Sequence, residues 1–253
     1  MRYGRFFVLA TLALFLTGAG NGQVISPGAK RRAEILDSSV KIFASFENKD
    51  PDNIEFFQRI GSGTIIWSGP DSYILTASHV IRLKGGAYLE GTVIEVQQPK
   101  EKDWLKAKFV GMDTERDLAV IKVHAVLKSA AVFAGEDAQP LIADDIYVAG
   151  YPDGRKLAIM RGMLTQSNGP KEGLDLTAPV YPGMSGGGVF WLDSDDQYKL
   201  IGVAWGYTLY DVQGKLSSKD PYEEDHKFTV RLPLLSRATG LQDIRTFLSE
   251  LDW

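Results

Sequence analysis

Residues 181–191 read Tyr-Pro-Gly-Met-Ser-Gly-Gly-Gly-Val-Phe-Trp, a stretch in which the hydroxyl of Ser185 stands among four glycines. Glycine has no Cβ, so the backbone here can adopt left-handed conformations and other atoms can approach Ser185 closely. Such a loop suits a nucleophile, but a glycine-rich turn between two strands has the same composition. The rest of the chain has to decide between these two interpretations.

The composition around this stretch favours a β-rich globular protein. The 253 residues are 44% hydrophobic and 24% charged, with 26 glycines and 11 prolines, which is enough apolar material for a sizeable core. Short runs of Val, Ile, Thr, Tyr and Phe between turn residues favour many strands over long helices. We expect strands at residues 40–46, 58–67, 73–77, 91–97, 105–110, 117–123, 146–149, 157–166, 199–206 and 228–232. Only residues 240–251 show clear helical spacing.

Charge and composition exclude several classes of function. The formal net charge of −4 gives no basic excess for binding nucleic acid. The chain has no cysteine, so neither a disulfide framework nor a thiolate nucleophile is available. Its three histidines are scattered and form no His-Glu-x-x-His motif, which argues against a metal hydrolase. We therefore expect neither a metal nor a cofactor.

The N-terminus differs from the rest of the chain. Arg2 and Arg5 precede an apolar run over residues 6–17, and small residues follow at 18–22, which is typical of a secretory signal. The run is shorter than the roughly 20 residues of a spanning helix, so we expect no stable membrane anchor. We predict a signal peptide at residues 1–22, a leader segment at 23–39 and the folded domain at 40–253, in a periplasmic or secreted protein.

Three residues carry the chemistry that this chain can offer. Serine is a poor nucleophile unless a base such as imidazole lies within hydrogen-bond reach and a third group orients that base. His79, Asp117 and Ser185 can fill these roles, and each lies at the end of a strand-like segment. Taken singly, they read equally well as a core histidine, a turn cap and a turn residue. Their joint occurrence favours a hydrolase.

These segments resemble the trypsin-like, or chymotrypsin-fold, serine peptidases, and among them the disulfide-free bacterial HtrA/Deg type. The stretch Gly-Ser-Gly-Thr-Ile-Ile at 61–66 with Ile-Leu-Thr-Ala-Ser-His-Val at 74–80 is similar to the family's histidine strands. Asp-Leu-Ala-Val-Ile-Lys-Val at 117–123 is similar to its aspartate strand, and Pro-Gly-Met-Ser-Gly-Gly at 182–187 to its nucleophile motif. Val-Ala-Trp-Gly at 203–206 looks like the strand beside its specificity pocket.

The resemblance implies an all-β fold of two antiparallel six-stranded β-barrels, at about 40–135 and about 140–253, with a C-terminal helix. It implies a serine endopeptidase that acts on proteins or peptides through an acyl-enzyme. We do not expect the peptide-binding PDZ domain that is common in HtrA relatives. His79, Asp117 and Ser185 would be catalytic, and the N–H groups of Gly183 and Ser185 would bind the oxyanion. The residues implied to bind substrate are Pro179, Ala204, Trp205 and Gly206.

The sequence departs from this family pattern at several places. Met184 stands where digestive members have an aspartate that pairs with a newly cut N-terminus, so activation by N-terminal insertion is not expected. Ala204 lacks a hydroxyl that many members place beside the aspartate, so we expect Asp117 to be less fully hydrogen-bonded. The expected pocket floor, formed near residues 178–180, Gly206 and a residue at 227–229, has no acidic group, which favours small or medium apolar side chains.

Two further readings stay open at this point. The Gly-Met-Ser-Gly-Gly motif also fits the nucleophile elbow of an α/β-hydrolase esterase, with His226 as the base. A peptidase-like binding module without turnover is the other reading, because a fold does not fix a function. The acidic segment at 207–226 is either a rim of the substrate cleft or a solvated surface loop.

Overall fold

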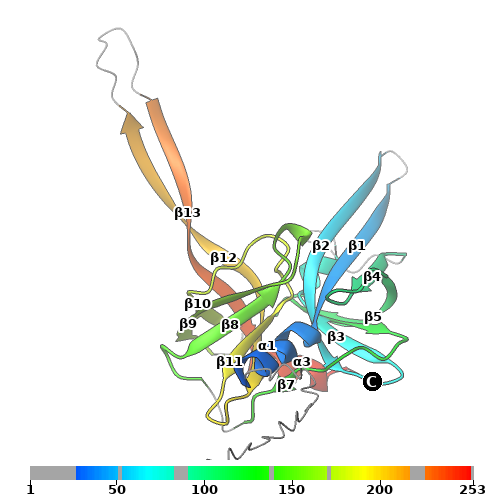
Figure 1. Ribbon diagram of the computed structural model, residues 1–253. Coiled ribbons are helices and arrows are strands. Elements are labelled where there is room, and N and C mark those ends of the chain that lie inside the picture. The colour runs from blue at the N-terminus through cyan, green and yellow to red at the C-terminus, as the bar shows by residue number, and fades with distance from the viewer. Residues whose placement is uncertain are drawn as a thin grey trace, which may run out of the picture.

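The structure is a computed structural model of the chain that describes residues 27–50, 53–82, 91–136, 140–169, 172–216 and 226–251 (Figure 1). The predicted signal peptide at 1–22 lies outside the described residues. Among the residues described, no helix has the length and apolar character needed to cross a membrane.

The first barrel is closed by strands in the order β1-β2-β3-β6-β5-β4, all paired antiparallel. Every one of these strands carries Val, Ile, Leu or Phe at positions that point inward, as the period of two in a half-buried strand requires. The strands are β1 (Ser39–Asp50), β2 (Asn53–Trp67), β3 (Ser72–Thr76), β4 (Val93–Gln97), β5 (Leu105–Asp113) and β6 (Leu118–Val123).

The second barrel runs β11-β8-β9-β10-β13-β12, and a pairing between β11 and β12 closes it. A two-residue strand, β7 (Val132–Phe133), adds to β12 in parallel from the segment that links the barrels. The strands are β8 (Asp145–Gly150), β9 (Ala158–Ser167), β10 (Leu174–Leu176), β11 (Gly188–Leu192), β12 (Tyr198–Leu216) and β13 (His226–Gly240). The predicted fold of two six-stranded antiparallel barrels is confirmed.

This topology excludes the α/β-hydrolase reading. That fold needs a helix directly after the nucleophile in a largely parallel sheet. Here the segment after Ser185 is β11, which pairs antiparallel with both β8 and β12.

Helices cover the junction of the two barrels. The predicted C-terminal helix is confirmed as α3 (Leu241–Ser249), and its Ile244 and Phe247 are buried in the same core cluster as the first-barrel strands. Helix α1 (Pro27–Ser38) was not predicted and lies entirely within the predicted leader segment at residues 23–39. Ile35, at 1% exposure, is its main buried apolar residue. The helix has too few apolar residues at helical spacing for its sequence to predict it.

Two strand pairs extend well beyond the barrels as ribbons (Figure 1). One is formed by β1 and β2, paired from Ser39 with Thr64 out to Asp50 with Asn53. The other is formed by β12 and β13, paired out to Leu216 with His226. The expected loop at 207–226 is therefore wrong for residues 207–216, which continue β12, while 217–225 lie outside the described residues.

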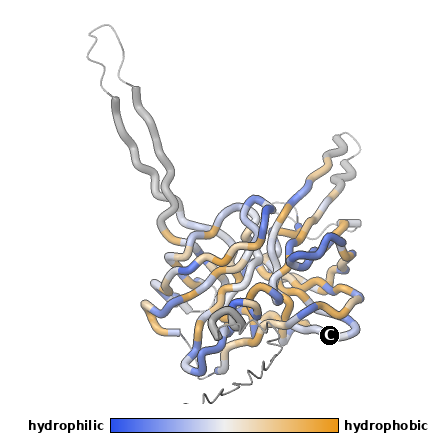
Figure 2. Tube along the Cα trace, in the orientation of Figure 1, coloured by the Kyte–Doolittle hydropathy of each residue, from blue (hydrophilic) through white to orange (hydrophobic). Residues whose placement is uncertain are grey.

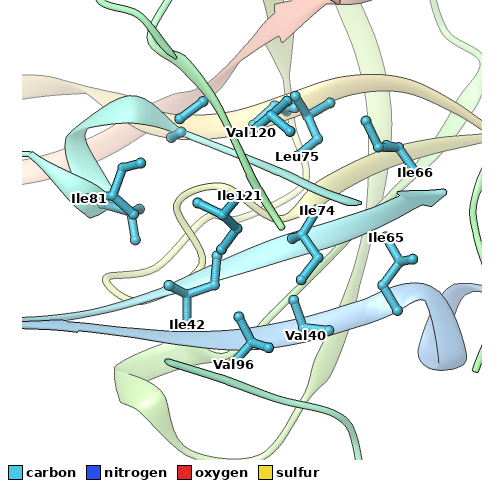
Figure 3. Packing of buried hydrophobic residues seen from close by; sticks show 14 of the residues in the cluster. Val40, Ile42, Ile65, Ile66, Ile74, Leu75, Ile81, Val96, Val120 and Ile121 are labelled. Carbon is cyan, nitrogen blue, oxygen red and sulfur yellow. The ribbon is translucent and has the colours of Figure 1, made fainter. Parts of the chain in front are cut away.

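The apolar core of the first barrel is drawn from all six strands. Hydrophobic residues recur along the barrel strands in Figure 2, and Figure 3 shows Ile42, Ile74 and Ile121 among the side chains that meet inside. All three are fully buried. Their packing is the main source of stability in a chain without disulfides.

We predict that Ile74→Ala lowers the free energy of unfolding by about 2 to 5 kcal/mol, because it leaves a cavity in this core. Ile142, which is 68% exposed, supplies the matched control, and Ile142→Ala is expected to cost less than about 0.5 kcal/mol. Urea unfolding followed by tryptophan fluorescence measures both, and equal losses would contradict this description of the core.

Candidate functional site

His79 lies on the short helix α2 (Ser78–Ile81), which begins one residue after β3 ends. Val80 and Ile81 are buried and fix this turn to the core. The guanidinium of Arg59, on β2, donates to the carbonyls of His79 and Arg82. Carbonyl groups at the end of a helix have no N–H partner within the helix, so Arg59 supplies one. The backbone around His79 is thus held by the buried side chains of Val80 and Ile81 and by Arg59, while the His79 side chain stays 35% exposed.

Asp117 follows a tight turn after β5 and has a left-handed φ of 55°. The Asp113 carboxylate accepts hydrogen bonds from the N–H groups of Glu115 and Arg116 at 2.8 and 2.9 Å, an arrangement that Asp favours in turns. The hydroxyl of Thr239, on β13, donates to the carbonyl of Arg116 at 2.7 Å. The turn that presents Asp117 is therefore anchored to the second barrel.

The Asp117 carboxylate and the His79 imidazole are directly bonded. The distance from His79 Nδ1 to Asp117 Oδ2 is 2.6 Å, and the backbone N–H of His79 donates to Asp117 Oδ1 at 2.9 Å. The Ser78 hydroxyl donates to the same Oδ1 at 2.7 Å and accepts from Arg82 Nε at 3.0 Å. The expectation that Asp117 is less fully hydrogen-bonded is wrong, because Ser78 supplies the hydroxyl that Ala204 lacks.

These bonds control the pKa of the carboxyl. Burial acts to raise the pKa of Asp117, but the hydrogen bonds and charge of His79, with the hydrogen bond from Ser78, outweigh burial and hold the pKa below its ordinary value. Asp117 is thus a carboxylate at neutral pH, and it fixes the ring orientation of His79.

Ser185 lies on the loop between β10 and β11, which we call the nucleophile loop (residues 181–187). Gly183 and Gly186 have φ of 87° and 86°, which side chains other than glycine rarely adopt. A Cβ on Gly186 would lie 2.1 Å from Thr76 Oγ1 and 2.2 Å from the Ser62 carbonyl. The loop backbone of the second barrel therefore lies directly against the first barrel, beside the strand that leads to His79.

Four consecutive carbonyl groups of this loop are held. Those of Pro182, Gly183, Met184 and Ser185 accept from Asp153 N, Ser62 Oγ, Gly187 N and Ser62 N, at 2.7, 2.7, 3.0 and 2.8 Å.

The N–H groups of the same loop divide into two sets. Those of Met184, Gly186 and Gly187 donate to backbone carbonyls. Those of Gly183 and Ser185 donate to no group among the residues that the structure describes. Both residues are partly exposed, and their two unused donors flank Met184 in the loop that carries the Ser185 hydroxyl. These are the two donors that the resemblance implied for an oxyanion.

The Ser185 hydroxyl makes a long hydrogen bond of 3.4 Å to the carbonyl of Trp205. Within the described ranges, no hydrogen bond joins Ser185 to His79. Bonds of this kind are often long or misaligned without substrate and tighten in the complex.

The four residues expected to bind substrate occupy different environments. Pro179 is exposed, while Ala204 is fully buried and exchanges backbone hydrogen bonds with Gly186 and Gly187. Trp205 and Gly206 are half-buried, and a Cβ on Gly206 would meet open space. The strand that carries Trp205 therefore contacts the nucleophile loop and has room beside Gly206.

The expected contribution of residues 227–229 to the pocket is wrong. Lys227 and Thr229 pair with Lys215 and Gln213, far out on the ribbon. The β13 residue beside the site is Ser236, which is buried and accepts from the Val180 N–H at 3.0 Å. The predicted strand ended at residue 232, whereas β13 continues to Gly240. The prediction therefore placed the wrong β13 residues opposite β12.

No group of His, Cys, Asp or Glu side chains suited to a metal ion occurs among the residues described. His124, which directly follows β6, lies away from the site and pairs with Asp71 at 2.5 Å.

A family model for the trypsin-like peptidase domain matches residues 61–203, more than half of the chain. The chain belongs to this family. The matched segment contains all three residues whose geometry is described above.

Curated relatives agree with this assignment. A probable periplasmic serine endoprotease DegP-like of Bartonella henselae is 31% identical over 178 residues, which are 64% of this chain and 32% of the relative. One of the same name from Halomonas elongata is 31% identical over 151 residues, 57% of this chain and 28% of the relative. The magnetosome formation protease MamE of Paramagnetospirillum magneticum is 27% identical over 108 residues, 43% of this chain and 14% of the relative. The chain thus spans about a third or less of the length of these relatives.

The lowered pKa of Asp117 predicts a pH-dependent contribution to stability. A carboxyl whose pKa is lower in the folded state stabilises the fold above its unfolded pKa of about 3.9, and this stabilisation is lost as pH falls through the folded pKa. Asp117→Asn is isosteric but uncharged, so we expect it to cost about 1 to 3 kcal/mol at pH 7. Urea unfolding from pH 7 to pH 3 should show this difference shrink below about pH 4. A difference that stays constant over the whole range would contradict the assignment.

Proposed function

We propose that this protein is an exported serine endopeptidase that uses Ser185, His79 and Asp117. The observation that carries the proposal is that each barrel supplies one part of a serine peptidase site. The first barrel supplies an imidazole bonded to a buried carboxylate at 2.6 Å, and the second supplies a serine on a loop with two unused N–H donors. Membership of the trypsin-like peptidase family supports the same reading.

Each group has one role in this mechanism. Ser185 Oγ attacks the carbonyl carbon of the substrate while His79 takes its proton, and the tetrahedral intermediate carries its negative charge on the former carbonyl oxygen. The N–H groups of Gly183 and Ser185 bind that oxygen. Asp117 holds Nδ1 of His79 as the protonated nitrogen, which leaves the other ring nitrogen free to accept the proton.

The second half of the reaction reverses these roles. Protonated His79 donates to the leaving amine as the peptide bond breaks, and an acyl group stays on Ser185. A water then gives its proton to His79 and attacks the acyl carbon, which releases the acid and restores the serine.

We further propose that the substrates are proteins or peptides with small or medium apolar side chains at the cleaved position. The expected pocket floor at residues 178–180 has no acidic side chain, and Ser236, which accepts from the Val180 N–H, is uncharged as well. Met184, which is fully buried in the core of the second barrel, cannot form an ion pair with a new N-terminus. Activation by insertion of a cut N-terminus is therefore not part of the proposal.

A fluorophosphonate probe tests the proposed nucleophile directly. We expect the purified protein to be labelled on Ser185, with labelling abolished in Ser185→Ala and slowed at least about 100-fold in His79→Ala, which lacks the base. His124→Ala, which removes a histidine on the outer end of β6, is the matched control and should label at the wild-type rate. No labelling of the folded wild-type protein would instead support a binding module without turnover.

Export is a separate part of the proposal. It rests on the basic and apolar N-terminus at residues 1–22 and on relatives whose names call them periplasmic. Expression of the full chain in a Gram-negative host should give a shortened protein in the periplasmic fraction, and removal of residues 2–22 should retain it in the cytoplasm. Recovery of uncleaved full-length chain from the cytoplasm would contradict export.

A further inference from the structure

Ser62 belongs to β2 of the first barrel, yet it makes more bonds to the second barrel than to its own. Its N–H donates to the Ser185 carbonyl at 2.8 Å and its hydroxyl to the Gly183 carbonyl at 2.7 Å. The same hydroxyl accepts from the Tyr151 N–H at 2.9 Å, and the Ser62 carbonyl accepts from Thr76 Oγ1 at 2.7 Å. With 1% exposure, Ser62 has no water to substitute for these partners.

The direction of the Ser62 hydroxyl is fixed by this arrangement. A serine hydroxyl has one proton to donate and lone pairs that accept. Because the Tyr151 N–H can only donate, it must occupy a lone pair, and the Gly183 carbonyl must receive the proton. The bond to the nucleophile loop therefore has no competing acceptor among the atoms bonded to Ser62 Oγ.

Gly183 is thereby held on both of its sides. On the preceding side, the Pro182 carbonyl accepts from the Asp153 N–H at 2.7 Å, and in a planar trans peptide the Gly183 N–H points the opposite way. On the following side, the Gly183 carbonyl is held by Ser62. A glycine at φ 87° has wide conformational freedom, so the loss of either anchor lets its N–H turn away.

We propose that Ser62 is a positioning residue for the oxyanion hole. Its hydroxyl orients the Gly183 N–H by holding the Gly183 carbonyl, and its backbone N–H orients the Ser185 N–H by holding the Ser185 carbonyl. This inference rests on the proposed peptidase function. Ser62 touches no reacting atom, and it acts only through the two loop residues that it holds.

The chain contains a close structural match for this serine. Ser72, at the far end of β3 from His79, is also fully buried. Its hydroxyl donates to the Ala125 carbonyl at 2.7 Å and accepts from the Leu127 N–H at 3.1 Å. Ser62→Ala and Ser72→Ala thus remove the same pair of side-chain bonds at equal burial, and only the first removes them from the nucleophile loop.

The test compares both variants with the wild type on fluorescein-labelled casein, with active sites counted by fluorophosphonate and melting temperatures measured by circular dichroism. We expect Ser62→Ala to lower kcat and kcat/KM together by about 10- to 100-fold with KM within about twofold, because misaligned donors weaken binding of the transition state only. Ser72→Ala should melt at a similarly reduced temperature and keep kcat within about twofold of the wild type.

The outcomes separate this inference from the proposed function. If the wild type cleaves casein and Ser62→Ala keeps its kcat, or if Ser72→Ala loses kcat to the same extent, the role of Ser62 is overturned and the peptidase stands. A wild type that neither labels nor cleaves overturns both. Should Ser62→Ala not fold, Ser62→Cys against Ser72→Cys gives the same comparison, since a thiol keeps the volume but donates weakly.

Discussion

The structure depends on a contact between backbones at Gly186. This residue leaves no room for a Cβ against Thr76 and Ser62 of the first barrel, and its N–H donates to the Ala204 carbonyl of the second barrel at 2.7 Å. Because Gly186 has no side chain, the nucleophile loop lies directly against the Thr76 hydroxyl and the Ser62 carbonyl, where a Cβ would be only 2.1 and 2.2 Å away. Docking of the barrels is thus what brings Ser185 beside the strand that delivers His79.

The aspartate turn is tied across the same junction by polar contacts. Thr239 donates to the carbonyl of Arg116, and the Arg116 guanidinium bonds Asp113 and lies 3.4 Å from the buried carboxylate of Asp243 on α3. Breaking one member of such a buried group leaves an uncompensated charge, so these contacts specify one arrangement of the turn. The residue that follows, Asp117, takes its left-handed backbone from this setting.

Most of the fold was predictable from local pattern. The strand that ends before His79 and the one that follows Asp117 are short apolar runs bounded by turn residues, and both were predicted to within about two residues, within the usual uncertainty of strand boundaries. The glycines of the nucleophile loop also indicated its tight backbone. These features depend on residues close in sequence, so periodicity and turn chemistry are enough to find them.

The features that escaped prediction depend on distant residues. The role of Ser62 exists only because residues 183–185, more than a hundred positions later, lie against it. Ser236 was missed because the predicted strand ended at residue 232, whereas β13 continues to Gly240 and pairs Ser236 with Tyr207 of β12. Ser78 was not predicted as a partner of Asp117 because the family pattern places the hydroxyl beside the aspartate at position 204 instead.

The two halves of the site are built in different ways. All the described bonds to the Asp117 carboxylate come from Ser78 and His79, which are adjacent on one helical turn, so the acid–base pair is set within the first barrel. The position of Ser185 is set by the second barrel and by the two bonds that Ser62 makes to the nucleophile loop. A small shift of one barrel on the other would therefore act first on the bonds that cross the junction, from Ser62 to the nucleophile loop and from Thr239 to the carbonyl of Arg116. Under the proposed function, the contacts that cross the junction set how Ser185 meets His79, and Ser62 is bonded to both barrels.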